Sequence, residues 1–153
     1  MVMEHNDLRQ RAWDAAASVC DPEIPGLSIA DLGVLRDVAV SGNEVEVAIT
    51  STYSGCPAMD WIARDVQSAL DRAGIAGRVR TALAPAWTSD WITAEGRRVL
   101  AANGIVPPTR AAIACPRCGS ANTERVSEFG STSCKALWRC RSCAEPFDVF
   151  KCH

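Results

Sequence analysis

Two Cys-x-x-Cys pairs near the end of the chain constrain its fold more than any other feature. Cys115 and Cys118 form the first pair, and Cys140 and Cys143 form the second after 21 intervening residues. Each pair makes a tight turn that directs two sulfur atoms toward one ion, and two pairs at about this separation are typical of a zinc site. Four thiolates around one tetrahedral ion leave no position for a substrate, so the spacing predicts a structural zinc ribbon.

The same four cysteines leave two other interpretations open. An iron–sulfur cluster is also held by four cysteine thiolates, and clustered cysteines form disulfide bonds in oxidising compartments. Disulfides are the least favoured, because the N-terminus shows no basic segment followed by an apolar one, the pattern of a secretory signal. We therefore expect a cytoplasmic protein, in which thiols stay reduced.

Three further candidate ligands lie in the same segment, namely Cys134, Cys152 and His153. In one interpretation Cys134 packs as a small apolar residue, and the last two residues have no role. In the other, the three residues form a second metal site or exchange with ligands of the first. The sequence leaves both interpretations open.

The preceding residues predict a small α+β domain. Hydrophobic periodicity indicates helices near 4–20, 57–74 and 87–103, and strands near 34–40, 44–50 and 78–83. The resulting order α-β-β-α-β-α predicts helices on one face of a sheet.

A stiff Pro107–Pro108 linker suggests a first domain over residues 1–108 and a metal-binding module over 109–153. The module is too short to bury a stable core without a metal or disulfides. Strands near 124–129, 136–139 and 146–151 complete the predicted ribbon.

Composition excludes several classes of function. The net charge is −2 and the sequence pI is near 5.7, so the basic surface of a nucleic-acid-binding protein is not expected. No apolar run approaches the roughly 20 residues that span a bilayer, so no membrane association is expected. The predicted sheet edges leave pairing into a homodimer open.

Cys56 is a second candidate site. It precedes Pro57 at a predicted helix start, where unpaired N–H groups and the helix dipole favour an anionic thiolate. In the loop before it, residues 50–54 all carry hydroxyl groups that can surround a ligand. Cys56 is therefore either a reactive or metal-transferring thiol, or a buried residue at the helix start.

The other distinctive side chains in this part have simpler interpretations. Cys20 is expected in the core, and Trp87 and Trp91 either anchor a helix or, if exposed, mark a surface for a partner. Arg78 and Arg80 are expected on a solvated face. The sequence contains no phosphate-binding loop and no metalloprotease motif, so no catalytic residues are predicted.

Two segments carry a resemblance to a known family. The segments DPEIPGLSIADLGVLRDVAV (21–40) and VEVAITSTYSGCPAMD (45–60) resemble the small iron–sulfur assembly factors that include SufT and the MIP-type targeting proteins. In that family the cysteine before proline is tied to iron–sulfur delivery. The resemblance implies that role for Cys56, with iron or an iron–sulfur cluster held transiently.

The remaining motifs narrow the resemblance. The segments WTSDW (87–91), GIVPP (104–108), CPRCGS (115–120), SEFGSTSCKALWRCRSC (127–143) and EPFDVFKCH (145–153) are similar to the PaaD family. Its members are accessory proteins of the bacterial phenylacetyl-CoA epoxidase, which acts in phenylacetate catabolism. The resemblance implies a non-catalytic maturation factor whose partners are the reductase or di-iron oxygenase components. Cys134, Cys152 and His153 belong to the matching motif.

Two alternative functions remain. The chain is a structural or interaction subunit of the epoxidase if Cys56 is buried and the tryptophans are exposed. A thiol-dependent enzyme is the least favoured, because no general base or oxyanion donors are identifiable for Cys56.

Overall fold

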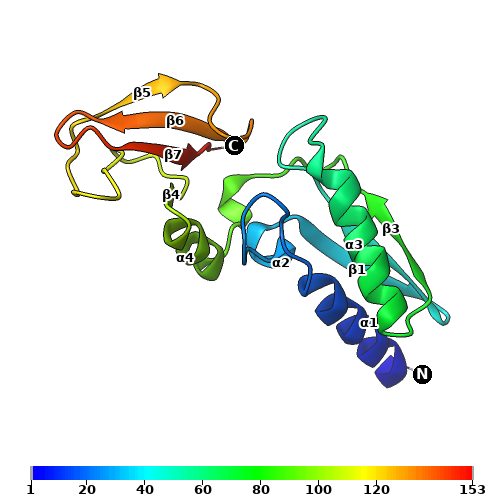
Figure 1. Ribbon diagram of the computed structural model, residues 1–153. Coiled ribbons are helices and arrows are strands. Elements are labelled where there is room, and N and C mark those ends of the chain that lie inside the picture. Colours follow the sequence, from blue (N-terminus) through cyan, green and yellow to red (C-terminus); the bar gives the residue numbers. More distant parts are fainter. Residues whose placement is uncertain (1, 153) are drawn as a thin grey trace. The chain divides into compact units, whose positions relative to one another are not determined.

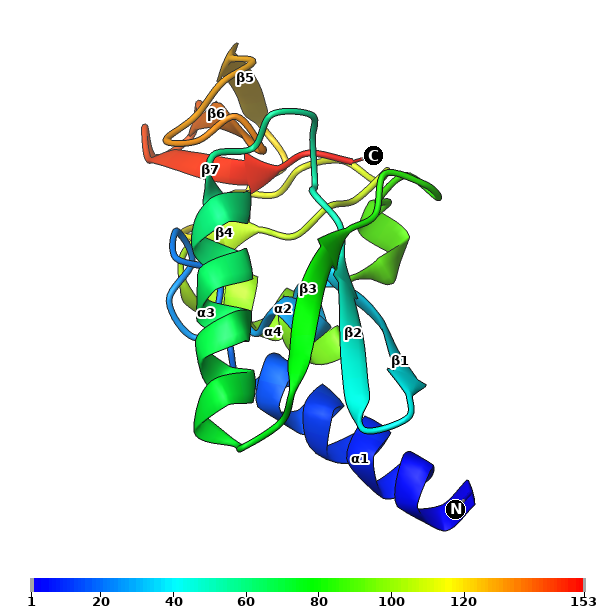
Figure 2. The same cartoon turned by 90° about the vertical axis from the view of Figure 1, so that its right-hand side faces the viewer.

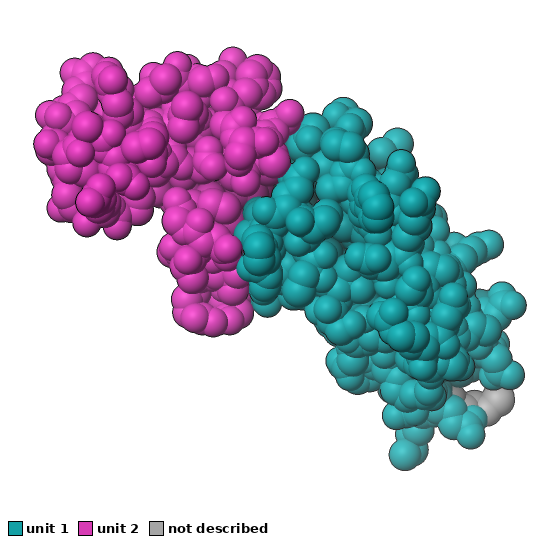
Figure 3. Space-filling view, in the orientation of Figure 1, with its two compact units in different colours: residues 1–87 teal, residues 88–153 magenta. Residues whose placement is uncertain are grey.

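A computed structural model describes residues 2–152 and divides the chain between Trp87 and Thr88 into two compact units (Figure 3). The first unit contains α1 (Val2–Ala17), α2 (Ile29–Leu32), β1 (Leu35–Ser41), β2 (Glu44–Ile49), α3 (Ala58–Arg72) and β3 (Gly77–Thr81). The second contains η1 (Ser89–Trp91), α4 (Ala94–Ala102), β4 (Ile105–Val106), β5 (Thr123–Ser127), β6 (Lys135–Cys140) and β7 (Pro146–Phe150). The predicted α+β class is confirmed (Figure 1).

The sheet of the first unit has the order β1-β2-β3. A tight turn joins β1 and β2 as an antiparallel hairpin, whereas β2 and β3 are parallel. Parallel neighbours need a crossover connection, which α3 provides (Figure 2). The carboxyl ends of β2 and β3 therefore meet at the same end of the sheet.

One face of this sheet carries the core of the first unit. Val45, Val47 and Ile49 alternate along β2 and are buried. Helices α1 and α3 contact each other and the sheet (Figure 2). Along α3, apolar side chains spaced four residues apart, including Ile62 and Val66, form the buried stripe.

The second unit contains a four-stranded sheet in the order β4-β7-β6-β5. β5, β6 and β7 form an antiparallel meander, and the two-residue β4 pairs in parallel with β7. The three predicted ribbon strands are thus confirmed. β4 was not predicted, because two residues are too few to show a period.

The helix predicted over residues 87–103 is divided into η1 and α4. Two threonines explain the interruption, because each caps a helix start: the Thr88 hydroxyl accepts from Asp90 N–H at 3.4 Å and the Thr93 hydroxyl from Gly96 N–H at 3.0 Å. Both elements belong to residues 88–153. The predicted domain boundary after residue 108 stays a prediction.

One expectation for a single side chain was wrong, and for Trp87 the structure favours the buried alternative. Cys20, expected in the core, is exposed, because it follows the last turn of α1 and forms only an isolated bridge to Ser28. Trp87 is buried at 5% exposure, and its indole N–H donates to the Leu32 carbonyl at 3.0 Å. Across residues 2–152, every helix is too short or too polar to cross a bilayer.

Candidate metal centre and thiol site

The four predicted zinc ligands lie together in the second unit. Their Sγ atoms are all within 4.8 Å of one another. Cys115 and Cys143 are 3.7 Å apart, and Cys118 and Cys140 are 3.6 Å apart, measured between sulfur atoms. A tetrahedral ion with Zn–S bonds of about 2.3 Å requires sulfur atoms about 3.8 Å apart. The donor set and its spacing therefore fit one zinc ion.

Backbone N–H groups in each knuckle point at the first sulfur of the pair. Arg117 and Cys118 donate to Cys115 Sγ at 3.4 and 3.5 Å, and Cys143 donates to Cys140 Sγ at 3.4 Å. Hydrogen bonds from Cys118 and Arg117 lower the pKa of Cys115. The Cys143 and Ser142 N–H groups lower the pKa of Cys140 to about 6. Both knuckles thus stabilise thiolates, the form that binds metal.

The second sulfur of each pair shows the opposite shift. The Glu145 N–H lowers the pKa of Cys143, but burial and the three neighbouring sulfur atoms outweigh it and raise the pKa to about 12. The Ser120 N–H likewise lowers the pKa of Cys118, but Cys140 and burial outweigh it, so the pKa of Cys118 is raised. Four thiols this close hold some protons until a cation replaces them. The site therefore suits a divalent metal, which would supply the missing positive charge.

Polar contacts join the two knuckles outside the sulfur atoms. Arg117 pairs with Glu145 at 2.9 Å, and the hydroxyls of Ser120 and Ser142 are 2.9 Å apart. Such contacts orient the metal ligands. Cys115 and Cys140 also belong to the apolar core, together with Phe147 and Val149. Cys143 is partly buried and Cys118 is exposed, so the centre lies at the margin of the ribbon core. Four sulfur ligands would fill a tetrahedral ion, as a structural site requires.

Two of the three additional candidate ligands, Cys134 and Cys152, are not part of this centre. Within residues 2–152 the four knuckle cysteines are the single group of three or more side chains placed to hold a metal. Cys134 is buried and lies 3.0 Å from the Thr132 hydroxyl, whereas Cys152 is exposed and contacts the Thr109 carbonyl at 3.4 Å. His153 lies outside the described residues, so a second site stays a prediction.

Cys56 lies at the end of the sheet where β2 and β3 both finish. It precedes the N-cap residue Pro57 of α3, and its carbonyl accepts from Met59 N–H at 3.2 Å. Its side chain is partly exposed rather than buried. The loop before it contains a local turn in which the Ser51 hydroxyl contacts the Tyr53 backbone. Cys56 is thus accessible at a helix start, and its role stays a prediction.

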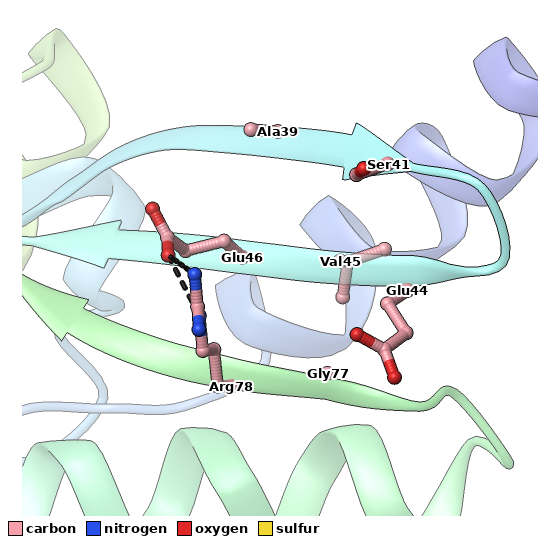
Figure 4. Close-up of a pocket in the computed structure, with 7 residues that line it drawn as sticks. All are labelled: Ala39, Ser41, Glu44, Val45, Glu46, Gly77 and Arg78. Carbon is pink, nitrogen blue, oxygen red and sulfur yellow. Dashed lines mark hydrogen bonds and ion pairs between the residues drawn. The ribbon is translucent and has the colours of Figure 1, made fainter.

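The open face of the first sheet holds an arrangement that sequence reasoning missed. Glu46 accepts from Arg78 at 2.8 Å (Figure 4) and from Arg80 at 2.9 Å. Both pairs lower the pKa of Glu46, and Arg80 contributes most. The arginines were expected on a solvated face, and their pairing with Glu46 was not predicted. This pairing could be recognised only once the parallel register of β2 and β3 was known, because that register places Arg78 opposite Glu46.

Fold and site together define a class of protein with two parts: a small α+β unit carrying an accessible cysteine, and a four-cysteine zinc ribbon. Family comparisons agree with both parts. A family model described as iron–sulfur cluster assembly protein matches residues 9–84, and one described as PaaD zinc beta ribbon domain matches residues 106–151. The chain belongs to the PaaD family, as its similarity to one curated protein shows.

That protein, from Escherichia coli K12, is named as a subunit of a "Putative 1,2-phenylacetyl-CoA epoxidase". It is 44% identical over 149 residues, which cover 92% of this chain and 90% of that protein. A second relative, the "Fe-S protein maturation auxiliary factor" of Porphyromonas gingivalis, is 35% identical over 81 residues. These cover 51% of this chain and 76% of the relative.

Solved structures agree with the fold of the first part. A domain of unknown function, DUF59, from Bacillus anthracis has a TM-score of 0.60 and 24% identity, covering 65% of this chain and 97% of that domain. A conserved hypothetical protein of Thermotoga maritima has a TM-score of 0.50 and 27% identity, covering 59% of this chain and 90% of that protein.

Proposed function

We propose that this chain is an accessory maturation factor for a phenylacetyl-CoA epoxidase, in which Cys56 holds iron or an iron–sulfur cluster during its transfer. The observation that carries the proposal is the accessible thiol at the start of α3, within the segment that matches the iron–sulfur assembly family. The names of both curated relatives support it. The recipient is a reductase or oxygenase component of the same system, in the cytoplasm.

The chemistry required of Cys56 is ligand exchange. Its thiol loses a proton when the sulfur binds an iron atom of the cargo, and a ligand of the recipient later replaces it. The proton returns to Cys56, and no change in oxidation state is needed. A single partly exposed sulfur at a chain turn suits such exchange, because few protein ligands have to be displaced.

The zinc ribbon has a different task in this proposal. Its four sulfurs are held by the knuckles; Cys115 and Cys140 are buried in the ribbon core, whereas Cys118 is exposed. A closed site of this kind retains its metal and does not pass it on. The ribbon therefore serves as a stable surface for protein partners, while Cys56 handles the cargo.

A substitution in cells tests the role of Cys56. In cells carrying Cys56→Ser we expect the epoxidase components to accumulate normally but to contain less iron or sulfide, with correspondingly lower activity. Cys20→Ser is the matched control, because Cys20 is also a free, exposed cysteine of the first unit. Full metal loading of the components with Cys56→Ser would exclude transfer through this sulfur.

The alternative of a structural subunit lacks the feature expected for it. Trp87 is buried, and Trp91 is only partly exposed. A more exposed tryptophan is Trp61 on α3, at 60%, and Arg64 lies 5.8 Å from its ring centroid. Cys56 is likewise accessible, whereas the alternative requires it to be buried.

A further inference from the structure

We propose that the outer edge of β5 binds a short extended segment of a partner protein that carries a large apolar side chain beside an acidic one. This surface lies in the zinc ribbon and involves neither the metal ligands nor Cys56. The proposal stands on three observations within residues 2–152: an unpaired strand edge, an adjoining pocket with apolar walls, and a cation without an ion pair.

The first observation is the edge itself. β5 pairs with β6 on one side, and no strand among residues 2–152 pairs with its other side. Arg141 N–H donates to the Asn122 carbonyl at 2.8 Å, so Asn122 bonds toward the β6 side. In an antiparallel pair every second residue along a strand bonds to the neighbouring strand. Glu124 therefore bonds toward β6, and the N–H and C=O of Arg125 point outward. Outward groups of this kind accept an added strand.

The second observation is a pocket beside this edge, with a volume of about 520 Å³. Ile113, Trp138 and Val149 supply apolar walls, and Arg125, Glu128 and Lys151 lie at its polar parts. Arg125 is the direct neighbour of Trp138 across the strands, so both side chains lie on one face. A strand added at β5 can therefore place one side chain in the pocket.

Exposed apolar side chains extend the surface along the strand. Val126 is 55% exposed and Phe129 is 60% exposed, although both lie in or directly after β5. Large exposed apolar groups next to a pocket are typical of interaction surfaces. A bulge between Arg125 and Ser127 limits the regular edge to the residues before it, so the bound segment is short.

The third observation is charge. The neighbouring Arg117, Arg139 and Arg141 form ion pairs with Glu145 or Glu124, whereas Arg125 has no ion pair among the described residues. Residues 88–153 contain nine basic and six acidic residues, and four thiolates with one Zn²⁺ would add −2, so the zinc-loaded segment has a net charge of +1. An acidic side chain in the bound segment would pair with Arg125.

The β3 edge of the first sheet lacks this combination. On the first sheet, Arg78 and Arg80 of the edge strand β3 are already paired with Glu46. The hollow beside them is lined mainly by short or charged side chains, such as Ala39, Ser41 and Glu44 (Figure 4). Charged, paired side chains are a common protection of edge strands. On β5 Glu124 is likewise paired, with Arg139 and Arg141, but Arg125 has no ion pair among the described residues. The β5 edge is therefore the better candidate.

Nuclear magnetic resonance on the full zinc-loaded chain tests the proposal with two short capped peptides. One alternates phenylalanine with glutamate, and the other alternates phenylalanine with lysine. We expect the acidic peptide to shift the amide signals of residues 123–126 and the indole signal of Trp138. The lysine peptide should bind at least about threefold more weakly.

Two variants and one control sharpen the test. Arg125→Glu should weaken binding of the acidic peptide at least about threefold, whereas Arg72→Glu, an exposed arginine of α3, should not. Arg125→Pro removes the outward N–H without removing a bond to β6 and should abolish binding. Because Arg125→Pro removes the guanidinium as well as the N–H, the edge is tested by comparison with Arg125→Glu, which keeps the N–H and should retain weak binding.

Three results would overturn the proposal. The first is the absence of shifts at residues 123–126 with either peptide. The second is equal binding of the acidic and basic peptides. The third is a change of the same amide signals on dilution without peptide, which would show that the edge pairs with a second copy of this chain.

Discussion

The two zinc knuckles carry different residues at one equivalent left-handed backbone position. Gly119 and Ala144 each follow the second cysteine of a pair, and both have positive φ, 77° and 66°. Their N–H groups make equivalent bonds, to the Cys115 and Cys140 carbonyls at 2.9 and 3.0 Å. Glycine adopts this conformation without steric cost, whereas alanine does not.

This difference predicts opposite effects of two exchanges. Ala144→Gly should raise the free energy of unfolding by about 0.5 kcal/mol, because relief of about 1 kcal/mol is partly offset by the greater freedom of glycine when unfolded. Gly119→Ala should lower the free energy of unfolding by a similar amount. Nothing lies within 4 Å of an added Cβ, so the cost comes from the positive φ alone and not from a clash. Urea denaturation of the zinc-loaded protein measures both, and shifts in the same direction would contradict the account.

Substitution of a metal ligand should have a larger effect. Cys140→Ser should abolish zinc retention and disorder the ribbon, because Cys140 is both ligand and core residue. The free energy that a structural zinc supplies is on the order of 10 kcal/mol. Elemental analysis after gel filtration provides the measurement.

Cys134→Ser is the control for this substitution, because Cys134 is also buried in the ribbon but lies outside the four-sulfur group. It should retain one zinc per chain. If Cys134→Ser lost zinc while Cys140→Ser retained it, Cys134 and not Cys140 would be the metal ligand.

The sequence predicted which cysteines lie together, because that prediction depends on local turns. The spacing of Cys115, Cys118, Cys140 and Cys143 was sufficient, because each knuckle is a local turn with fixed chemistry. The exposure of Cys20 and the burial of Trp87 were not predictable in the same way. Both depend on how α1 and α2 pack, and the Trp87 contact joins it to Leu32, far away in sequence.

At the scale of elements, strand periodicity located β1, β2 and β3, but register decides what their side chains do. The parallel register of β2 and β3 places Arg78 beside Glu46 and Arg80 beside Ala48. The alternating pattern showed which residues share a face, and not which strands are neighbours. The pairing of Glu46 with both arginines followed only from the sheet order.

Glu46→Gln should reduce stability at neutral pH. The folded state lowers the pKa of Glu46 below its ordinary value of 4.5, Arg80 and Arg78 being the main causes. The ion pairs therefore stabilise the protein above pH 4.5, and their contribution is lost as the pH falls through the lowered pKa.

Thermal unfolding at a series of pH values checks this. The difference in stability between the natural protein and Glu46→Gln should be present at pH 7 and shrink below pH 4.5. Glu44→Gln is the control, because Glu44 has no ion pair among the described residues. A difference that is unchanged at low pH would argue for a packing effect instead.

At the scale of the whole molecule, the two units depend on different sources of stability. The first unit buries apolar side chains from two helices and a sheet, including Val47, Ile62 and Leu70. The ribbon core is small and includes two of its own metal ligands. Zinc is therefore expected to decide the folding of the ribbon and not that of the first unit.

Metal removal tests this division. A strong chelator should abolish hydrogen-exchange protection of β5, β6 and β7 while β1, β2 and β3 remain protected. The same chelator saturated with zinc serves as the control. Simultaneous loss of protection in both sheets would contradict separate stabilisation of the two units.

The most direct test of the proposed function is the metal content of the epoxidase components in cells that lack this chain. We expect the reductase or oxygenase components to accumulate normally but to contain less iron or sulfide. Chemical reconstitution of their metal centres should then restore activity without this chain. Fully loaded components that become active only when this chain is added would contradict the account and show a structural subunit.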